Sequence, residues 1–109
     1  WVRQNFLQVL VQKHQVPASL IAIEKEIKWG ETKKRFDILV YKDTKPWLIV
    51  ECKEMNVPLS ESVLQQVLHY NSKLETDYMI ITNGNDTFGF DIRNDQPTVL
   101  SSLPNFVTD

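Results

Sequence analysis

The sequence has 109 residues, of which 42% are hydrophobic, 10% aromatic and 24% charged. This length and composition predict one folded domain with its own core, and they exclude an intrinsically disordered chain. The formal net charge of −2 excludes a strongly basic protein and, taken alone, argues against nucleic-acid binding.

The distribution of charge is uneven along the chain. Residues 1–74 carry a net charge of +3, whereas residues 75–109 carry −5. The single cysteine, Cys52, cannot form an internal disulfide, which favours a reducing, cytoplasmic location. No apolar run is long enough to span a bilayer, so we expect no membrane segment. Because the sequence opens on Trp1 and not Met, we expect it to be a fragment of a longer chain.

Residues 1–15 predict an amphipathic helix. Their apolar side chains follow the 3.6-residue period, as at Val2, Phe6, Val9 and Leu10. The helix should end before Pro17, because a residue that precedes proline disfavours the α region.

Three antiparallel strands are predicted next, over residues 20–29, 36–41 and 47–53. Polar turns at 30–34 and 43–46 separate them. The third strand contains a continuous apolar run, which indicates burial on both faces and hence a central position in the sheet.

A second helix is predicted over residues 60–74, with Ser60 as its cap. Residues 78–82 should form a strand parallel to the third one, since a helix crosses over between them. A last strand covers 87–92. The expected order is α-β-β-β-α-β-β, an α/β domain with a mixed sheet and a helix on either side. We expect a single domain over 1–109, with its core in about 1–92 and an irregular tail over 93–109.

Charged residues interrupt the apolar strands at two places. In the second strand, alternation puts Phe36, Ile38 and Val40 on one face and Asp37 on the other. Glu51 and Lys53 end the third strand and share a face. If these two strands pair around the turn at 43–46, both acids and the lysine converge at one end of the sheet.

Two carboxylates and a lysine in one place suit the hydrolysis of phosphodiesters. Carboxylate oxygens of Asp37 and Glu51 are ligands for a hard cation such as Mg²⁺, and the backbone carbonyl of Cys52 is a further candidate ligand. The metal lowers the pKa of a bound water, and Lys53 can orient that water or stabilise negative charge. The alternative for each residue alone is an ordinary strand end or turn cap. Buried charge without a partner is costly, which favours the functional interpretation of the set.

The predicted second helix adds Gln66 and Tyr70, which are four residues apart and therefore lie on one helical face. Gln66 falls at the border of the apolar stripe, where its amide can bond a catalytic group or a phosphate. The alternative is a surface Gln66 and a core Tyr70.

Taken together, Asp37, Glu51-Cys52-Lys53 and Gln66-x-x-x-Tyr70 resemble the PD-(D/E)xK nuclease superfamily. The sequence is most similar in its motifs to the N-terminal nuclease domain of type I restriction enzyme R subunits, over about residues 1–92. The further matching stretches are Glu24-Lys25-Glu26-Ile27, the segment from Arg35 to Val40, the segment from Pro46 to Lys53, and Thr82-Asn83-Gly84.

The resemblance implies a restriction-endonuclease-like fold and Mg²⁺-dependent cleavage of double-stranded DNA, with Mn²⁺ as a substitute metal. It implies Asp37 and Glu51 as metal ligands, Lys53 as the catalytic lysine, and Gln66 and Tyr70 as residues that complete the site. Methylation and specificity subunits of a restriction complex are the implied partners. The candidate DNA contacts are Lys33, Lys34 and Arg35.

The sequence departs from the family pattern in two ways. Phe36 stands where the superfamily's name puts proline, and residues 1–15 contain no acid, although many members carry a metal-binding Glu on the first helix. Either that Glu lies upstream of Trp1 or the site lacks it, with Glu24 and Glu26 as substitutes of lower rank. The alternative functions are a catalytically inactive module that binds DNA or partner proteins and, more remotely, an RNA-directed nuclease.

Overall fold

The computed structural model describes residues 2–29, 32–70, 76–94 and 96–102, without the side chains of residues 27, 29, 32, 34 and 70. Its secondary-structure elements follow the chain in the order α1 (Val2–Gln12), a short 3₁₀ helix (Ala18–Leu20), β1 (Ile21–Trp29), β2 (Thr32–Lys42), β3 (Lys45–Cys52), α2 (Glu61–Tyr70), β4 (Tyr78–Thr82), β5 (Thr87–Asp91) and β6 (Thr98–Val99).

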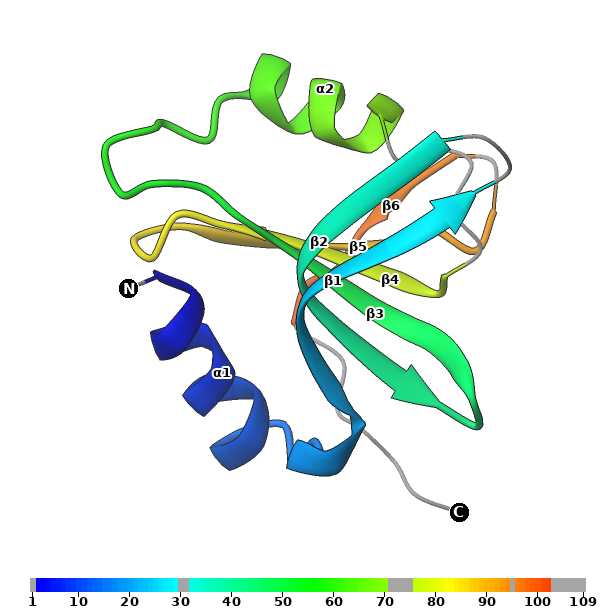
Figure 1. The fold of residues 1–109 in the computed structure, drawn as a ribbon. Helices are drawn as coiled ribbons and strands as arrows, with labels where there is room; N and C mark the ends of the chain where they lie inside the picture. Colours follow the sequence, from blue (N-terminus) through cyan, green and yellow to red (C-terminus); the bar gives the residue numbers. More distant parts are fainter. Residues whose placement is uncertain (1, 30–31, 71–75, 95, 103–109) are drawn as a thin grey trace.

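The strands form one sheet in the order β1-β2-β3-β4-β5-β6 (Figure 1). Neighbouring strands are antiparallel except for β3 and β4, which run parallel because α2 crosses over between them. Residues 47–50 of β3 are buried, which confirms that this apolar strand is central. The predicted α/β class with a mixed sheet is therefore confirmed.

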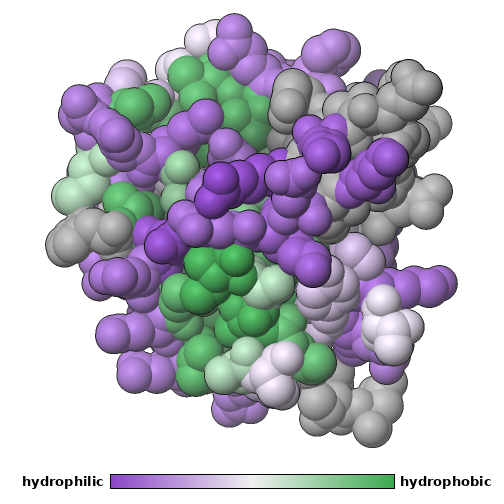
Figure 2. All heavy atoms as spheres, in the orientation of Figure 1, coloured by the Kyte–Doolittle hydropathy of each residue, from purple (hydrophilic) through white to green (hydrophobic). Residues whose placement is uncertain are grey.

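Helix α1 covers one face of the sheet. Its buried side chains, Phe6 and Leu10, pack against Ile38, Leu48 and Val50 of the two central strands. The 3.6-residue period of its apolar side chains is what produces this single buried face. Figure 2 shows hydrophobic side chains gathered between α1 and the sheet, and hydrophilic ones over most of the rest of this side.

Helix α2 lies on the opposite face (Figure 1). Val67 and Leu68 pack against Met79, Ile81 and Phe90 of β4 and β5. The predicted cap is present, because the Val63 N–H donates to Ser60 Oγ at 3.4 Å and the Leu64 N–H donates to the Ser60 carbonyl at 3.0 Å. No helix in the described part of the chain has the length and hydrophobicity that crossing a bilayer requires.

Several predicted boundaries differ from the structure, among them the end of α1, which comes at Gln12 and not at residue 15. Two of the differences change the sheet. Strand β2 begins at Thr32 and not at residue 36, because residues 32–35 pair with 26–29 of β1 and so belong to a long hairpin. The tail, predicted as irregular, contributes β6, in which Thr98 and Val99 pair with β5. Both segments contain polar side chains, so their hydrophobic pattern does not indicate a strand. They are strands because their backbones pair with a neighbour, not because their side chains are buried.

The predicted face of Phe36 is wrong. Ile38 and Val40 join the core under α1, as expected, but Phe36 packs with Leu39 and Ile49 in a separate cluster. The last described pair between β2 and β3 is Ile38↔Val50, so β2 leaves the β3 ladder just before Phe36. Strict alternation fails where the strand is no longer held on both sides.

The hairpin of β1 and β2 curves at Glu24. This residue lies between the pairs Ile23↔Ile38 and Lys25↔Phe36, so it is level with Asp37, and its φ of 52° is in the left-handed region. A non-glycine residue adopts that conformation only when its surroundings hold it there. Figure 1 shows both strands bending together at their middle.

Candidate active site

Asp37 and Glu51 lie at the same end of the β2–β3 ladder. They come one residue beyond its last described pair, Ile38↔Val50, on neighbouring strands. Asp37 is fixed by the backbone of β3, because the Cys52 N–H donates to Asp37 Oδ2 at 2.8 Å. The structure thus brings together two acids that are 14 residues apart in sequence.

Lys53 completes the trio. Its Nζ lies 3.5 Å from Glu51 Oε1, and the exposed fractions of the Lys53 and Glu51 side chains are 33% and 26%. Burial raises the pKa of the Glu51 carboxyl above its ordinary value, and the charge of Asp37 raises it further against the opposing effect of Lys53. The site therefore holds a desolvated carboxylate beside a second one, with a single lysine as local counter-charge.

These residues fit a divalent cation in their chemistry. Two carboxylates on neighbouring strands, one of them with its charged form disfavoured mainly by burial, suit a Mg²⁺ ion, and such an ion keeps several waters. No group of three or more His, Cys, Asp or Glu with a metal-binding arrangement occurs in the described part of the chain. A cation here would accordingly rest on two side chains, with its remaining ligands from elsewhere.

Cys52 lies between Glu51 and Lys53 in sequence, but its side chain points to the opposite face of the sheet. Its side chain packs against the hydrophobic core under α1. Burial raises the pKa of its thiol to about 12, and the charges of Asp37 and Glu51 add to this effect. A thiol that stays protonated at neutral pH is a poor nucleophile, so cysteine-based chemistry does not suit this site.

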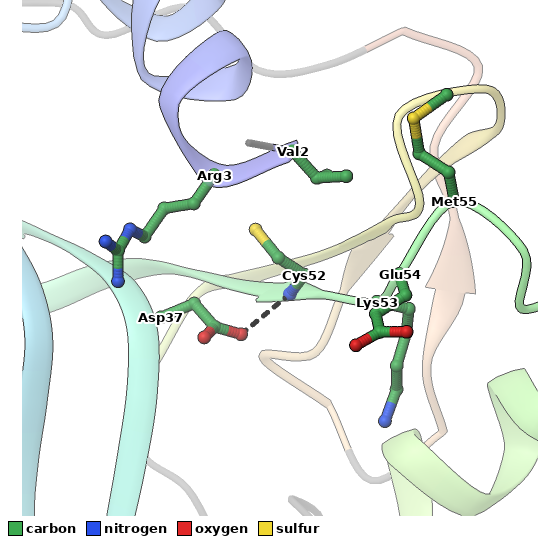
Figure 3. A pocket seen from close by; sticks show the side chains of 7 residues that line it. All are labelled: Val2, Arg3, Asp37, Cys52, Lys53, Glu54 and Met55. Carbon is green, nitrogen blue, oxygen red and sulfur yellow. Dashed lines mark hydrogen bonds between the residues drawn. The ribbon is translucent and has the colours of Figure 1, made fainter.

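A pocket of about 490 Å³ adjoins Asp37 on the side of α1. The residues that line it are Val2, Arg3, Asp37, Cys52, Lys53, Glu54 and Met55. Figure 3 shows Arg3 reaching from α1 towards β2, Asp37 pointing at the Cys52 backbone, and Lys53 pointing away from α1. The pocket therefore opens beside one of the two carboxylates, between the first helix and the segment that follows β3.

For the two residues predicted to complete the site from the second helix, the structure describes only the side chain of Gln66. Gln66 is exposed on α2, although the sequence puts it at the border of the apolar stripe. Within the described residues, no hydrogen bond joins it to Asp37, Glu51 or Lys53. The side chain of Tyr70 lies outside the described part of the structure.

The basic residues of the hairpin are exposed but have acidic partners. Lys33 Nζ lies 3.7 Å from Glu26 Oε1, and Arg35 Nη2 lies 3.2 Å from Glu24 Oε2. The side chain of Lys34 lies outside the described residues. Glu24 and Glu26, the substitute metal ligands of lower rank, thus have cationic neighbours across the hairpin.

Two further residues near the site were given no role from the sequence, although one of them, Asn83, lies in a stretch that matches the family pattern. Arg3 on α1 donates from Nη1 to Glu24 Oε1 at 2.5 Å, and it lines the pocket. Asn83 is buried in the β4–β5 turn, where Nδ2 donates to the Val57 carbonyl at 2.8 Å and so ties this turn to the segment after β3. The Asn83-Gly84 dipeptide was a detectable turn signal, whereas nothing local to Arg3 indicates its partner.

Gly84 lies against the same pocket wall. Its φ of +92° favours glycine, and a Cβ added there would lie 3.3 Å from Val2 Cγ2 and 3.5 Å from Met55 Cγ. A side chain at this position would therefore strain the turn and press on two of the residues that line the pocket.

Comparison with known proteins gave a family and a fold. The family model described as type I restriction enzyme R protein N terminus matches residues 1–104. A solved fragment, described as an HsdR subunit of a type I restriction enzyme from Vibrio vulnificus YJ016, superposes with a TM-score of 0.64 at 21% identity. That alignment covers 95% of this chain but 23% of the other, so this chain spans under a quarter of its length. No curated protein gave a significant match.

Proposed function

This chain belongs to the family of type I restriction enzyme R protein N termini, and from that premise we propose that it is a Mg²⁺-dependent endodeoxyribonuclease domain. Its substrate is double-stranded DNA, and the reaction is hydrolysis of a phosphodiester bond. It acts in the cytoplasm within a restriction complex that includes methylation and specificity subunits. Mn²⁺ is the expected substitute metal.

The observation that carries this proposal is the placement of Asp37, Glu51 and Lys53. The first two residues lie on neighbouring strands, one residue beyond the last β2–β3 pair, and Lys53 Nζ lies 3.5 Å from Glu51 Oε1. The raised pKa of the Glu51 carboxyl is caused mainly by burial, with Asp37 adding to it against the effect of Lys53, and it indicates that the charged form is poorly solvated in the site. A bound divalent cation would stabilise that charged form.

Asp37 and Glu51 are the proposed metal ligands, with the Cys52 carbonyl as a third. The metal, when bound, acidifies a water and neutralises charge that develops on the phosphate. The Cys52 N–H holds Asp37 in place through its 2.8 Å bond to Oδ2. Lys53, next to Glu51, orients the attacking water and stabilises the negative charge of the transition state.

The remaining sequence-based assignments complete the proposal. Gln66 and Tyr70 would act from α2, where an exposed Gln66 is free to contact substrate and not the carboxylates directly. Lys33, Lys34 and Arg35 would contact DNA phosphates from the hairpin, in competition with the acids of β1. Shared charges of this kind weaken phosphate binding, so DNA binding by this domain alone should be modest.

The test is cleavage of supercoiled plasmid DNA by the purified chain and, in parallel, by a longer R subunit that contains it. We expect nicking with Mg²⁺ or Mn²⁺, none with EDTA, and none of a matched RNA. Asp37→Asn and Lys53→Ala should each slow nicking by at least about 100-fold, because each removes charge stabilisation in the transition state.

Matched controls exist on the same chain. Asp86→Asn changes an exposed aspartate in the β4–β5 turn, and Lys45→Ala changes an exposed lysine at the start of β3. Both should cleave at the wild-type rate. Nicking that persists unchanged in Asp37→Asn or Lys53→Ala would contradict the assigned roles.

A DNA-binding module without turnover is the second candidate function. It is favoured by Arg3, because α1 contributes a cation and not an acid to the pocket that Asp37 lines. Isothermal titration with Mg²⁺ or Mn²⁺ separates the two functions. Binding at millimolar metal that is lost in Asp37→Asn supports the nuclease, whereas no binding by the folded wild type supports the module.

A further inference from the structure

The pocket beside Asp37 is lined by a cation, Arg3 of α1, to which the proposed hydrolysis gives no role. Its other side consists of residues after β3, among them Lys53, Glu54 and Met55. Its volume of about 490 Å³ is in the range of pockets that hold small-molecule ligands and single nucleotides. Polar groups gather at the Asp37 end, and Val2 and Met55 supply an apolar surface.

The charge of Arg3 is not fully neutralised by its partner. One carboxylate, Glu24, serves two guanidinium groups, with Arg3 Nη1 at 2.5 Å from Oε1 and Arg35 Nη2 at 3.2 Å from Oε2. These three residues carry a net charge of +1, whereas the charged residues that line the pocket, Arg3, Lys53, Asp37 and Glu54, sum to zero. Attraction of an anion therefore depends on Arg3 itself and not on an excess of positive charge in the pocket. The Arg3 side chain keeps 32% of its surface exposed, so its free N–H groups are accessible from the pocket.

The geometry also holds the Arg3 guanidinium in a defined place. Glu24 lies level with Asp37 across the β1–β2 pair, and its left-handed backbone belongs to the bend of the hairpin. Figure 3 shows the Arg3 side chain directed towards β2, on which Asp37 lies. An arginine held by a carboxylate on one side presents its remaining donors in a fixed fork, which matches two oxygens of a phosphate.

We propose that Arg3 binds a phosphate of the DNA strand in this pocket, next to the phosphodiester that Asp37 and Glu51 act upon. Val2 and Met55 contact the sugar of the intervening nucleotide. This inference rests on the proposed function, since it takes DNA as the substrate. Glu24 is a positioning residue in it, because it acts on DNA only through Arg3.

The competing role for Arg3 is structural: its ion pair with Glu24 attaches α1 to β1. The two roles make different predictions for the partner residue. If Arg3 only fastens α1, removing either member of the pair has the same effect. If Arg3 binds phosphate, removing Arg3 weakens DNA binding, whereas Glu24→Gln removes one negative charge but keeps an oxygen acceptor that holds the Arg3 guanidinium in place.

The experiment is DNA binding by fluorescence anisotropy, without divalent metal, over a series of KCl concentrations. Four proteins are compared: wild type, Arg3→Gln, Glu24→Gln and Arg93→Gln. The last is a matched control, because Arg93 also forms a short ion pair, with Asp91 of β5 at 2.6 Å, towards the β6 edge of the sheet. It removes one positive charge without touching the pocket.

We expect Arg3→Gln to weaken binding by about five- to tenfold at low salt and to reduce the slope of log K against log salt by about 0.9. Glu24→Gln should bind at least as tightly as wild type, and Arg93→Gln should match wild type. Thermal melting of each variant verifies that it is folded. Arg3→Lys keeps the positive charge but not the planar guanidinium with its paired N–H donors. It should therefore show the salt slope of the wild type but only part of the wild-type affinity.

Three results would overturn the inference. These are equal losses of affinity in Arg3→Gln and Glu24→Gln, equal effects of Arg3→Gln and Arg93→Gln, or no DNA binding by wild type. The measurement is independent of hydrolysis. If the wild type cleaves DNA and Arg3→Gln binds DNA as tightly as the wild type, this inference alone is rejected. If DNA binding depends on Arg3 but the wild type does not cleave DNA, the nuclease function alone is rejected.

Discussion

The half-buried carboxylate of Glu51 lies at the end of β3, beside Asp37 and Lys53. Burial disfavours its charged form, and the negative charge of Asp37 disfavours it further, so its pKa is raised in the folded protein. The burial that suits this residue to its proposed role as a metal ligand thus opposes folding of the metal-free protein. Destabilised charges of this kind are typical of functional sites.

A neutral residue at this position should therefore stabilise the metal-free protein. A group with a raised pKa in the folded state destabilises folding above that pKa, and this effect disappears below its unfolded value, near 4.5. We expect Glu51→Gln to melt at a higher temperature than wild type at pH 7 in EDTA, with the difference vanishing as the pH falls below 4.5. Differential scanning calorimetry across this pH range measures it.

Added Mg²⁺ provides the internal control for this prediction. Millimolar Mg²⁺ should raise the melting temperature of the wild type and leave Glu51→Gln unchanged, since a ligand stabilises only the state that binds it. A variant that is less stable than wild type at pH 7 in EDTA would show that the Lys53 contact outweighs the burial of Glu51.

At the scale of elements, α1 determines whether the pocket exists. It contributes Val2 and Arg3 to the pocket, yet it is attached to the sheet mainly through Phe6 and Leu10. A helix of this length is marginal in isolation, so its stability comes from that packing. The site consequently depends on hydrophobic contacts two turns away from it.

Leu10→Ala tests that dependence. Leu10 is 2% exposed, and truncating a buried leucine costs about 2–5 kcal/mol through lost burial and a residual cavity. We expect a loss in this range in urea unfolding, together with weaker DNA binding. Val11→Ala on the same helix is the control, because Val11 is 41% exposed and should change stability by less than about 0.5 kcal/mol. Equal effects of the two substitutions would contradict this packing of α1.

At the scale of the whole molecule, the order of the strands in the sheet separates the basic and the acidic parts of the sequence in space. The strands lie in sequence order from β1 to β6, and the acidic excess lies in residues 75–109. The basic hairpin is therefore at one edge, whereas the described acids of the C-terminal part, Asp77, Asp86 and Asp91, lie in or beside β4 and β5, nearer the other edge. A net charge of −2 consequently does not exclude DNA, because a surface with separated charges can orient a polyanion towards its basic edge.

This arrangement predicts weak, salt-sensitive DNA binding whose strength depends on the charges near the contact surface and not on the total charge. With Arg3, Lys33 and Arg35 as phosphate contacts, log K should fall with log salt at a slope of about −3. Glu26→Gln, which releases Lys33 from its partner at 3.7 Å, should strengthen binding, whereas Asp91→Asn at the opposite side of the sheet should not. Anisotropy titrations in KCl measure both, and an equal gain in the two variants would show that only total charge matters.

Much of the fold follows from local patterns. The apolar run of residues 47–50 and the turns around it indicate a central strand in an antiparallel pair, and the crossover through α2 requires a parallel β4. Period-two alternation placed Glu51 and Lys53 on one face, with Cys52 opposite, because pairing with β4 continues through Cys52 and keeps this end of β3 regular. For the same reason the convergence of Asp37 with Glu51 could be predicted from a short hairpin.

The tertiary structure decided what depends on distant partners or on irregular backbone. Phe36 changes face because β2 is no longer held by β3 there, and β6 exists only through its pairing with β5. Arg3 meets Glu24 across 21 positions, at a residue whose backbone is itself left-handed, so no periodicity predicts the contact. The sequence by itself therefore determined the acids and the lysine of the site, which short-range strand geometry brings together. Only the packing of α1 against the bent hairpin added a cation and a pocket beside them.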